Sequence, residues 1–237
     1  MLLFYLRHGD PIYNPDSLTE QGKKQAEALA KRLALYGIDE IYASTSNRAK
    51  MTAQPTCDLV GKDMQLLDFA NEGHAWEELT ADNGHRREWL FHEPTARGWL
   101  IDADVLSRGF TWYESPVFAG YDYKKGIERI RKETDAFMLS LGYEHVPFSG
   151  YYKTVAPHDK RVALFAHQGF GLAFLSCLLD IPYPVFSMRF DLNRSCMTVI
   201  EFKEENGISI PRLMTLSNDS HLYREGLPTL YNGRVRF

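Results

Sequence analysis

Two histidines occupy matching positions in this sequence, each directly after a largely apolar run. His8 follows residues 2–7, and His167 follows residues 161–166. A lone histidine after a strand is usually a core residue, but two histidines at equivalent strand ends indicate a shared function. Sheets in which strands alternate with helices place their active sites at the carboxyl ends of the strands. A histidine placed there can act as a nucleophile or exchange protons near neutral pH.

Two arginines accompany these histidines. Arg7 directly precedes His8, and Arg48 follows a second apolar run and a Ser-Thr-Ser loop. A guanidinium group is permanently charged and planar, so it can donate to two phosphate oxygens at once. Together the two arginines and the two histidines predict a phosphate clamp beside a nucleophile.

The elements that must position these side chains alternate along the chain. Short apolar runs predict strands, and apolar residues spaced at i, i+3, i+4 and i+7 predict helices. The expected strands are residues 2–6, 38–44, 65–69, 161–166, 196–203 and 208–216. The expected helices are one that begins after a cap at Ser17 or Thr19 and ends at Gly37, then residues 47–60, 123–141 and 169–179. An Asn206-Gly207 pair predicts a hairpin turn between the last two strands. This order predicts an α/β fold with helices on both faces of a mostly parallel sheet.

Residues 70–122 do not follow this alternation. The segment contains all four tryptophans of the chain and shows no clear period. It is either an irregular insertion that covers the active site or a second core rich in aromatic residues. One domain over residues 1–237 fits both interpretations. Substrate specificity is expected to come from residues 70–122 and 143–158.

The composition excludes several classes of function. With 44% hydrophobic residues and a net charge of −4, the chain lacks the basic character expected of a nucleic-acid-binding protein. No apolar stretch reaches the roughly 18 residues of a membrane span. The first residues do not resemble a signal peptide, and the three cysteines have apolar neighbours, which predicts buried free thiols in a cytoplasmic protein. The sequence leaves a homo-oligomer open.

Four ordered segments resemble the histidine phosphatase superfamily, in the branch named for phosphoglycerate mutases. The segments are Arg7-His8-Gly9-Asp10-Pro11-Ile12-Tyr13-Asn14, then Leu18-Thr19-Glu20-Gln21-Gly22 with Gln25-Ala26, then Ser44-Thr45-Ser46-Asn47-Arg48-Ala49-Lys50-Met51-Thr52-Ala53, and the strand that ends at His167. The resemblance covers residues 1–80 and 120–203. It implies a three-layer α/β/α sandwich and phosphoryl transfer through a covalent phosphohistidine.

The resemblance also implies roles for the four core residues. His8 corresponds to the nucleophile, and Arg7, Arg48 and His167 correspond to groups that hold the phosphoryl oxygens. A nucleophilic histidine must be neutral, and two nearby guanidinium groups favour this by lowering its pKa. With several fixed cations to stabilise the transferring group, no metal ion or other cofactor is expected.

Three further sets of residues have expected roles beside this core. The leaving oxygen needs a proton, and Glu72 is the expected general acid, with Glu77 and Glu78 as alternatives. Asn14 and Gln168 are expected to contact the substrate. Arg86-Arg87 and Arg97 are either ordinary surface charges or groups that reach a second anion of the substrate.

The leading hypothesis is a metal-independent phosphomonoesterase that acts on small phosphorylated metabolites through a phosphohistidine on His8. A phosphoglycerate mutase is the alternative, because it would use the same four core residues. The mutase-type segment Asn-Glu-Arg-His-Tyr-Gly is not present near Glu72, which favours hydrolysis. A catalytically weak phospho-ligand-binding protein is the second alternative.

Overall fold

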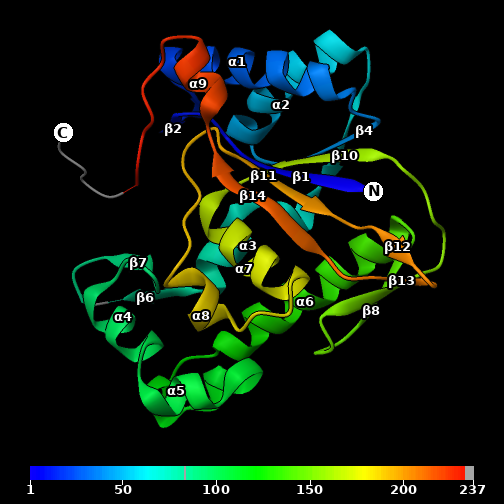
Figure 1. Cartoon of the computed structure of the whole chain (residues 1–237). Coiled ribbons are helices and arrows are strands. Elements are labelled where there is room, and N and C mark those ends of the chain that lie inside the picture. Colours follow the sequence, from blue (N-terminus) through cyan, green and yellow to red (C-terminus); the bar gives the residue numbers. More distant parts are fainter. Residues whose placement is uncertain (83, 233–237) are drawn as a thin grey trace.

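A six-stranded sheet forms the centre of the computed structural model, which describes residues 1–82 and 84–232 (Figure 1). Its strands, in spatial order, are β14 (Arg212–Asn218), β11 (Met197–Glu201), β1 (Leu2–Arg7), β10 (Arg161–Ala166), β4 (Glu40–Ser44) and β5 (Met64–Leu67). The strands β1, β10, β4 and β5 are parallel, and β11 and β14 form an antiparallel edge. The predicted α/β class is confirmed.

Helices cover both faces of this sheet and complete the three layers (Figure 1). One face carries α1 (Glu20–Tyr36), α2 (Asn47–Val60) and α9 (Ser220–Arg224). The opposite face carries α3 (Glu72–Glu78), α6 (Tyr123–Ser140), α7 (Gln168–Leu178) and α8 (Tyr183–Ser187). The expected helix over residues 47–60 and the expected strand over residues 161–166 match α2 and β10 residue for residue.

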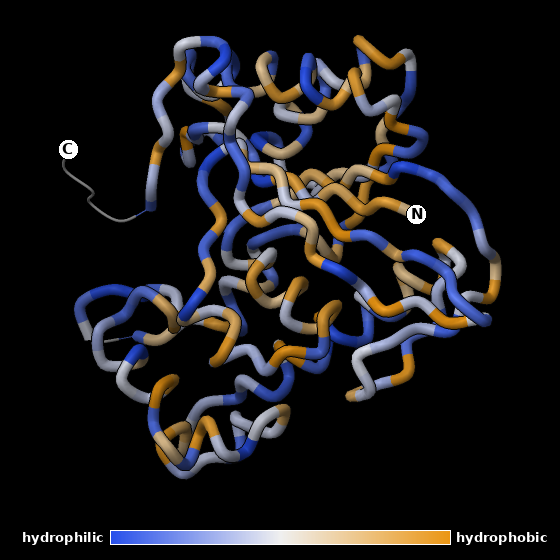
Figure 2. The backbone as a smooth tube through the Cα atoms, viewed as in Figure 1, coloured by the Kyte–Doolittle hydropathy of each residue, from blue (hydrophilic) through white to orange (hydrophobic). Residues whose placement is uncertain are grey.

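The side chains of β1 show why two helical layers are needed. Phe4 packs in a core cluster with Leu29 of α1, whereas Tyr5 belongs to the other cluster and stacks on Phe174 of α7 at 5.5 Å between ring centroids. Successive side chains of a strand point to opposite faces. A strand that is apolar at every position must therefore be covered on both faces. Figure 2 shows hydrophobic residues running through these central strands.

The helices next to the site begin and end at residues suited to those positions. The hydroxyl of Thr19 accepts a hydrogen bond from the backbone N–H of Gly22 at 3.0 Å, so Thr19, and not Ser17, caps α1. Gly37 ends α1 with φ of 70°, and Gly61 ends α2 with φ of 66°. These left-handed conformations suit a residue without a Cβ atom.

A second, four-stranded sheet lies away from the first at the edge of the molecule (Figure 1). Its order is β12 (Glu204–Glu205), β13 (Ile208–Ser209), β9 (Tyr151–Thr154) and β8 (Tyr143–Val146). Asn206 and Gly207 have φ of 55° and 80° and form the turn between β12 and β13. The predicted hairpin is therefore confirmed, although it joins two short strands.

The segment 70–122 contains short elements where the sequence showed no period. These are α3, β6 (Thr80–Asp82), β7 (Arg87–Trp89), α4 (Pro94–Leu100) and α5 (Ala103–Ser107), followed by the 3-10 helices η2 (Gly109–Glu114) and η3 (Pro116–Phe118). A further 3-10 helix, η1 (Asp68–Ala70), precedes α3, and a hairpin of β2 (Pro11–Tyr13) and β3 (Asp16–Leu18) follows β1. Elements of three to seven residues are too short for their apolar residues to reveal a period.

This segment contributes to an aromatic core. Trp112 is buried and stacks on Tyr123 and Tyr183, with ring centroids 5.9 and 5.6 Å apart. The interpretation as an aromatic core therefore holds for this part of the segment. Two other tryptophans of the segment line the pocket described below.

Three further expectations concern the whole chain. Cys57, Cys177 and Cys196 are free and buried, as predicted. Across the part of the chain that the structure describes, no helix combines the length and the apolar character that crossing a bilayer requires. A single domain over residues 1–237 stays a prediction, and residues 83 and 233–237 of that range lie outside the described residues.

Candidate functional site

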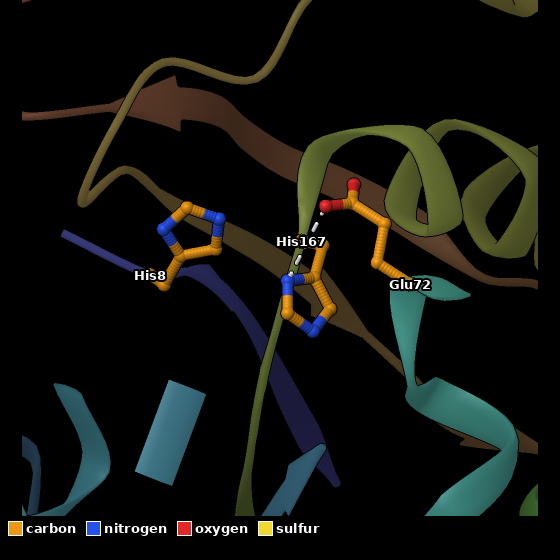
Figure 3. A group of neighbouring side chains, drawn as sticks. All are labelled: His8, Glu72 and His167. Atoms are coloured by element: carbon orange, nitrogen blue, oxygen red, sulfur yellow. Dashed lines mark ion pairs between the residues drawn. The ribbon is translucent and has the colours of Figure 1, made fainter. Parts of the chain in front are cut away.

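The pairing of β1 with β10 brings the two histidines together. Arg7 and Ala166 are partners at the carboxyl ends of these parallel strands, so the next residue of each strand is a histidine. The backbone N–H of His8 donates to Ala166 O at 3.0 Å, and the imidazole rings of His8 and His167 lie 5.2 Å apart. Both rings belong to buried residues, and Figure 3 shows them at the end of the sheet with Glu72 beside them.

The hydrogen bonds of His8 define its tautomer. Its Nδ1 atom lies 2.7 Å from the carbonyl oxygen of Gly9, which can only accept, so Nδ1 carries the proton. The Nε2 atom accepts from the Nε–H group of Arg48 at 3.3 Å. Burial lowers the pKa of His8 well below its usual value, and the neighbouring His167, Arg7 and Arg48 lower it further. A neutral ring with a lone pair on Nε2 is the form that can attack phosphorus.

Arg48 is the central cation of the site. It lies in the first turn of α2, and its side chain is only 12% exposed. Its two terminal nitrogens donate to Asp16 at 2.9 Å and to Glu72 at 3.0 Å. Tyr13 lies against the guanidinium group, with 5.4 Å between the Cζ atom and the ring centroid. Arg48 therefore connects His8, two carboxylates and an aromatic ring.

Glu72 is the one of the three candidate acids that reaches this cluster. It begins α3, where the side chain of Asn71 caps the helix by accepting from Gly73 N–H at 3.0 Å. Its Oε2 atom lies 3.6 Å from His167 Nδ1, and Figure 3 shows the carboxylate turned toward that atom. Its Oε1 atom accepts from the backbone N–H of Gly169 at 2.9 Å.

The two alternative acids point to other partners. Glu77 pairs with Arg87 at 2.6 Å on the surface. Glu78 accepts two hydrogen bonds from the Nε atom of Arg129 and one from its terminal nitrogen. Neither contacts a histidine of the site, so the geometry favours Glu72.

Two serine hydroxyl groups contact the imidazole ring of His167 on the edge opposite to Glu72. Its Nε2 atom lies 2.8 Å from the hydroxyl of Ser44 and 3.1 Å from that of Ser46. Burial lowers its pKa well below the usual value, with contributions from Arg48 and Arg7. Its buried Nδ1 atom forms no hydrogen bond with any described residue, and it faces the carboxylate of Glu72.

Arg7 is buried behind this cluster. One terminal nitrogen donates to Leu192 O and to Asn232 Oδ1, both at 2.5 Å. Its Nε–H group has no hydrogen-bond acceptor among the described residues. The charge of Arg7 lowers the pKa of both histidines, but its guanidinium group does not line the pocket in this conformation.

A pocket of about 880 Å³ opens beside Arg48 and Glu72. Its wall includes Tyr13, Trp76 and Trp89. His8 and His167, which are 1% and 0% exposed, are not part of the wall, although Arg48 and Glu72 contact them. The histidines therefore lie directly behind the first layer of side chains.

Two residues expected to contact substrate lie elsewhere. Asn14 is exposed in the turn between β2 and β3 and does not line the pocket. Gln168 is buried, and its amide donates to Asp191 Oδ1 at 2.6 Å. Residues 143–158 belong to the second sheet and its flanking loops and contribute nothing to the pocket wall.

Sequence reasoning missed several residues of the site. Ser44 and Ser46 were given no role at the site from the sequence. They lie one and three residues beyond the buried Ala43 of β4, which places them at the same sheet edge as the histidines. Asp16 received no role from the sequence, yet it accepts a hydrogen bond from Arg48. Only the tertiary structure reveals that Gly169 donates to Glu72.

The same cluster contains atoms that are able to bind a metal ion. His8, Glu72 and His167 each offer one ligand atom, and these atoms lie within 4.8 Å of one another. Two imidazoles and a carboxylate form a donor set that suits zinc. Arg48, however, already donates to His8 and to Glu72, and its positive charge opposes a second cation at this position.

A comparison with protein families identifies a match for the first part of the chain. Residues 3–104 match the family model described as the histidine phosphatase superfamily (branch 1). The search of curated proteins found no match.

Several solved structures share the fold. One is described as mycobacterial hydrolase 1, with 19% identity, a TM-score of 0.62, and coverage of 92% of this chain and 98% of that chain. A phosphoserine phosphatase from Entamoeba histolytica in complex with 3-phosphoglyceric acid is 20% identical, with a TM-score of 0.60 and coverage of 93% and 98%. A mycobacterial glucosyl-3-phosphoglycerate phosphatase is 21% identical, with a TM-score of 0.61 and coverage of 91% and 98%. At these identities the likeness shows the fold alone.

Proposed function

Residues 3–104 belong to the histidine phosphatase superfamily, and from this premise we propose that the chain is a metal-independent phosphomonoesterase that acts through a covalent phosphohistidine on His8. One observation carries the proposal. His8 is buried, neutral and protonated on Nδ1, and its Nε2 lone pair faces the guanidinium group of Arg48. The similar solved structures include phosphatases whose substrates are small phosphorylated molecules, which supports the same class of substrate here.

The first chemical step forms one bond and breaks one bond. The Nε2 atom of His8 attacks phosphorus, and the bond between phosphorus and the ester oxygen breaks. Glu72, acting in its protonated form, donates a proton to the leaving oxygen, which departs as an alcohol. Arg48, the Gly169 N–H group and His167 stabilise the charge on the three equatorial oxygens, with Arg7 adding a second guanidinium charge nearby.

The second step releases phosphate. Water attacks the phosphohistidine, the Glu72 carboxylate accepts the proton of that water, and the P–N bond breaks. His8 regains its lone pair, and inorganic phosphate leaves. Throughout the cycle the positive charge that a metal ion would supply comes from the arginines, which cannot lose their protons.

The conformation described here is a resting state in this proposal. The two oxygens of Glu72 use the donor groups of Arg48 and Gly169 that the phosphoryl group requires. The arriving phosphoryl group displaces the carboxylate toward the ester oxygen, which is where a general acid must be. Binding of the substrate therefore also moves the Glu72 carboxylate into the position of the general acid.

Several sequence-based expectations stay predictions. These are contacts of Asn14 and Gln168 with substrate and a cytoplasmic location, and the sequence leaves a homo-oligomer open. A contact with Asn14 would require movement of the β2–β3 turn, and a contact with Gln168 would require its amide to leave Asp191.

The test is hydrolysis of an aryl phosphate in the presence of EDTA. The wild-type chain should release inorganic phosphate, and His8→Ala should lose that activity by several orders of magnitude. His74→Ala is the matched control, because His74 is an exposed histidine bound to Asp68 outside the pocket. Activity that disappears with EDTA, or that survives in His8→Ala, would refute the proposal, and substrate isomerisation without phosphate release would indicate a mutase.

A further inference from the structure

The wall of the pocket beside Arg48 is aromatic. Trp76 and Trp89 meet edge to face with 5.1 Å between ring centroids, and Tyr13 is 66% exposed. Monomeric proteins rarely leave several large aromatic side chains around an open cavity unless the cavity binds something. The mechanism proposed above uses none of these three rings.

The aromatic wall reaches the place where the phosphoryl group binds. Trp89 packs directly on Gly169, because a Cβ atom added at that glycine would lie 2.3 Å from Trp89 Cζ2. The backbone N–H of the same glycine donates to Glu72. A group attached to a phosphoryl oxygen at this position would therefore lie within contact distance of the indole rings.

The charges of the wall disfavour a second anion on the substrate. Among the described residues that line the pocket, Arg48 is the one cation, and it is already bound to Asp16 and Glu72. Arg87, one of the cations that the sequence offered for a second anionic group, pairs with Glu77 and does not line the pocket. A substrate carboxylate or second phosphate would lie near Asp16 without a cation of its own, which costs free energy.

The remaining polar groups of the wall suit hydroxyl groups. Asn47 offers an amide at an exposed position of the wall. Asn71 and Thr45 also line the pocket and carry no charge, but the Asn71 amide donates to Thr45 at 2.8 Å and caps α3, and the Thr45 hydroxyl donates to Asp68. A volume of about 880 Å³ also exceeds what a phosphoryl group with a three-carbon acid would fill. Size, charge and polarity thus favour the same kind of leaving group.

We infer that the leaving group of the substrate is an uncharged alcohol with a flat ring, such as a nucleoside or an aryl alcohol, that packs against Trp76 and Trp89. This inference rests on the proposed function, since it concerns the alcohol that hydrolysis releases. Tyr13 closes the outer side of the ring, and the amide of Asn47 binds a hydroxyl group of the alcohol. Trp76 is then a specificity-determining residue, and phosphoserine or 3-phosphoglycerate is a poor ligand.

The experiment measures binding, so that it does not depend on turnover. His8→Ala is titrated by tryptophan fluorescence with adenosine 5′-monophosphate and with 3-phosphoglycerate, which are both alkyl phosphate monoesters. Adenosine 5′-monophosphate should bind at least tenfold more tightly. Adding Trp76→Ala should remove roughly a factor of ten from its affinity, as loss of a base–aromatic stack usually does, and should leave the affinity for 3-phosphoglycerate nearly unchanged.

A matched control separates specificity from folding. Trp99→Ala removes another half-buried tryptophan of the same segment, which contacts Phe118 and Tyr121 outside the pocket, and it should not change the preference. Tyr13→Ala, at an exposed position, serves as the second test should Trp76→Ala fail to fold, and it should also weaken nucleotide binding. Equal or tighter binding of 3-phosphoglycerate would overturn the inference. If the chain prefers the nucleotide but hydrolyses no phosphate ester, the aromatic wall still binds the ring, whereas the proposed function and the leaving-group role that rests on it are refuted.

Discussion

Replacing Glu72 by alanine should tighten the binding of inorganic phosphate while it slows catalysis. In the structure the carboxylate accepts one hydrogen bond from Arg48 and one from the Gly169 N–H group. Both bonds involve the charged carboxylate, and a hydrogen bond to a charged group contributes about 1.5–3 kcal/mol. The displaced carboxylate regains hydrogen bonds to water, so roughly half of the sum of the two opposes phosphate binding. The variant should therefore bind phosphate with a Kd about 10- to 150-fold lower, corresponding to about 1.5–3 kcal/mol.

Isothermal titration calorimetry with inorganic phosphate measures the change in phosphate affinity directly. Steady-state kinetics measure the loss of catalysis. Hydrolysis of an alkyl phosphate should fall by about 10²–10⁴ in Glu72→Ala, because its leaving oxygen needs a proton. Hydrolysis of 4-nitrophenyl phosphate should fall much less, because nitrophenolate leaves without one. Glu77→Ala removes an exposed carboxylate of the same helix and should change neither quantity. Unchanged or weaker phosphate binding in Glu72→Ala would refute the reasoning.

Three further predictions follow from burial and charge. Because burial and the neighbouring cations lower the pKa of His8, its ring stays neutral at pH 6.5, and its imidazole NMR signals should not titrate near that value; titration of His8 near pH 6.5 would contradict this. Burial lowers the pKa of His145, but hydrogen bonds to Asp135 and Asp180 outweigh the effect of burial and raise that pKa to about 9. The stabilisation, at most about 3 kcal/mol, is therefore complete below the unfolded-state value of 6.5 and lost as pH rises through 9. Asp135→Asn should flatten the dependence of Tm on pH between about 6.5 and 9. An unchanged slope would contradict the stabilising role of the bond between His145 and Asp135. Gly169→Ala should lower the free energy of unfolding by about 1–3 kcal/mol in urea titrations, because its Cβ atom would collide with Trp89; wild-type stability would contradict the packing.

Strands and helices could be predicted from the sequence where an apolar run or a terminal glycine marks their ends. Strand β10 is an apolar run bounded by charged and polar residues, and α2 ends at a glycine with a left-handed backbone, so both were predicted to the residue. The two histidines were predicted as neighbours because parallel strands share a carboxyl edge, and the structure places their rings 5.2 Å apart.

Contacts between distant segments could not be predicted in this way. Arg7 donates to Asn232, 225 positions later in the chain, and nothing in either local sequence indicates that contact. The bond between Gly169 and Glu72 depends equally on how α3 packs against α7. Specificity was expected partly from residues 143–158, but those residues form strands of the second sheet, because their hydrogen-bonding partners lie there and not at the site.

The central claim is a covalent phosphoryl group on Nε2 of His8. The most direct measurement is rapid quenching of the wild-type chain at alkaline pH during turnover of a ³²P-labelled phosphate ester, followed by peptide mapping. Phosphohistidine survives alkali and is lost in mild acid. We predict acid-labile label on the peptide that contains His8, attached at Nε2, and no label in His8→Ala. Phosphate release by wild type without any label, or label on another residue, would contradict the account.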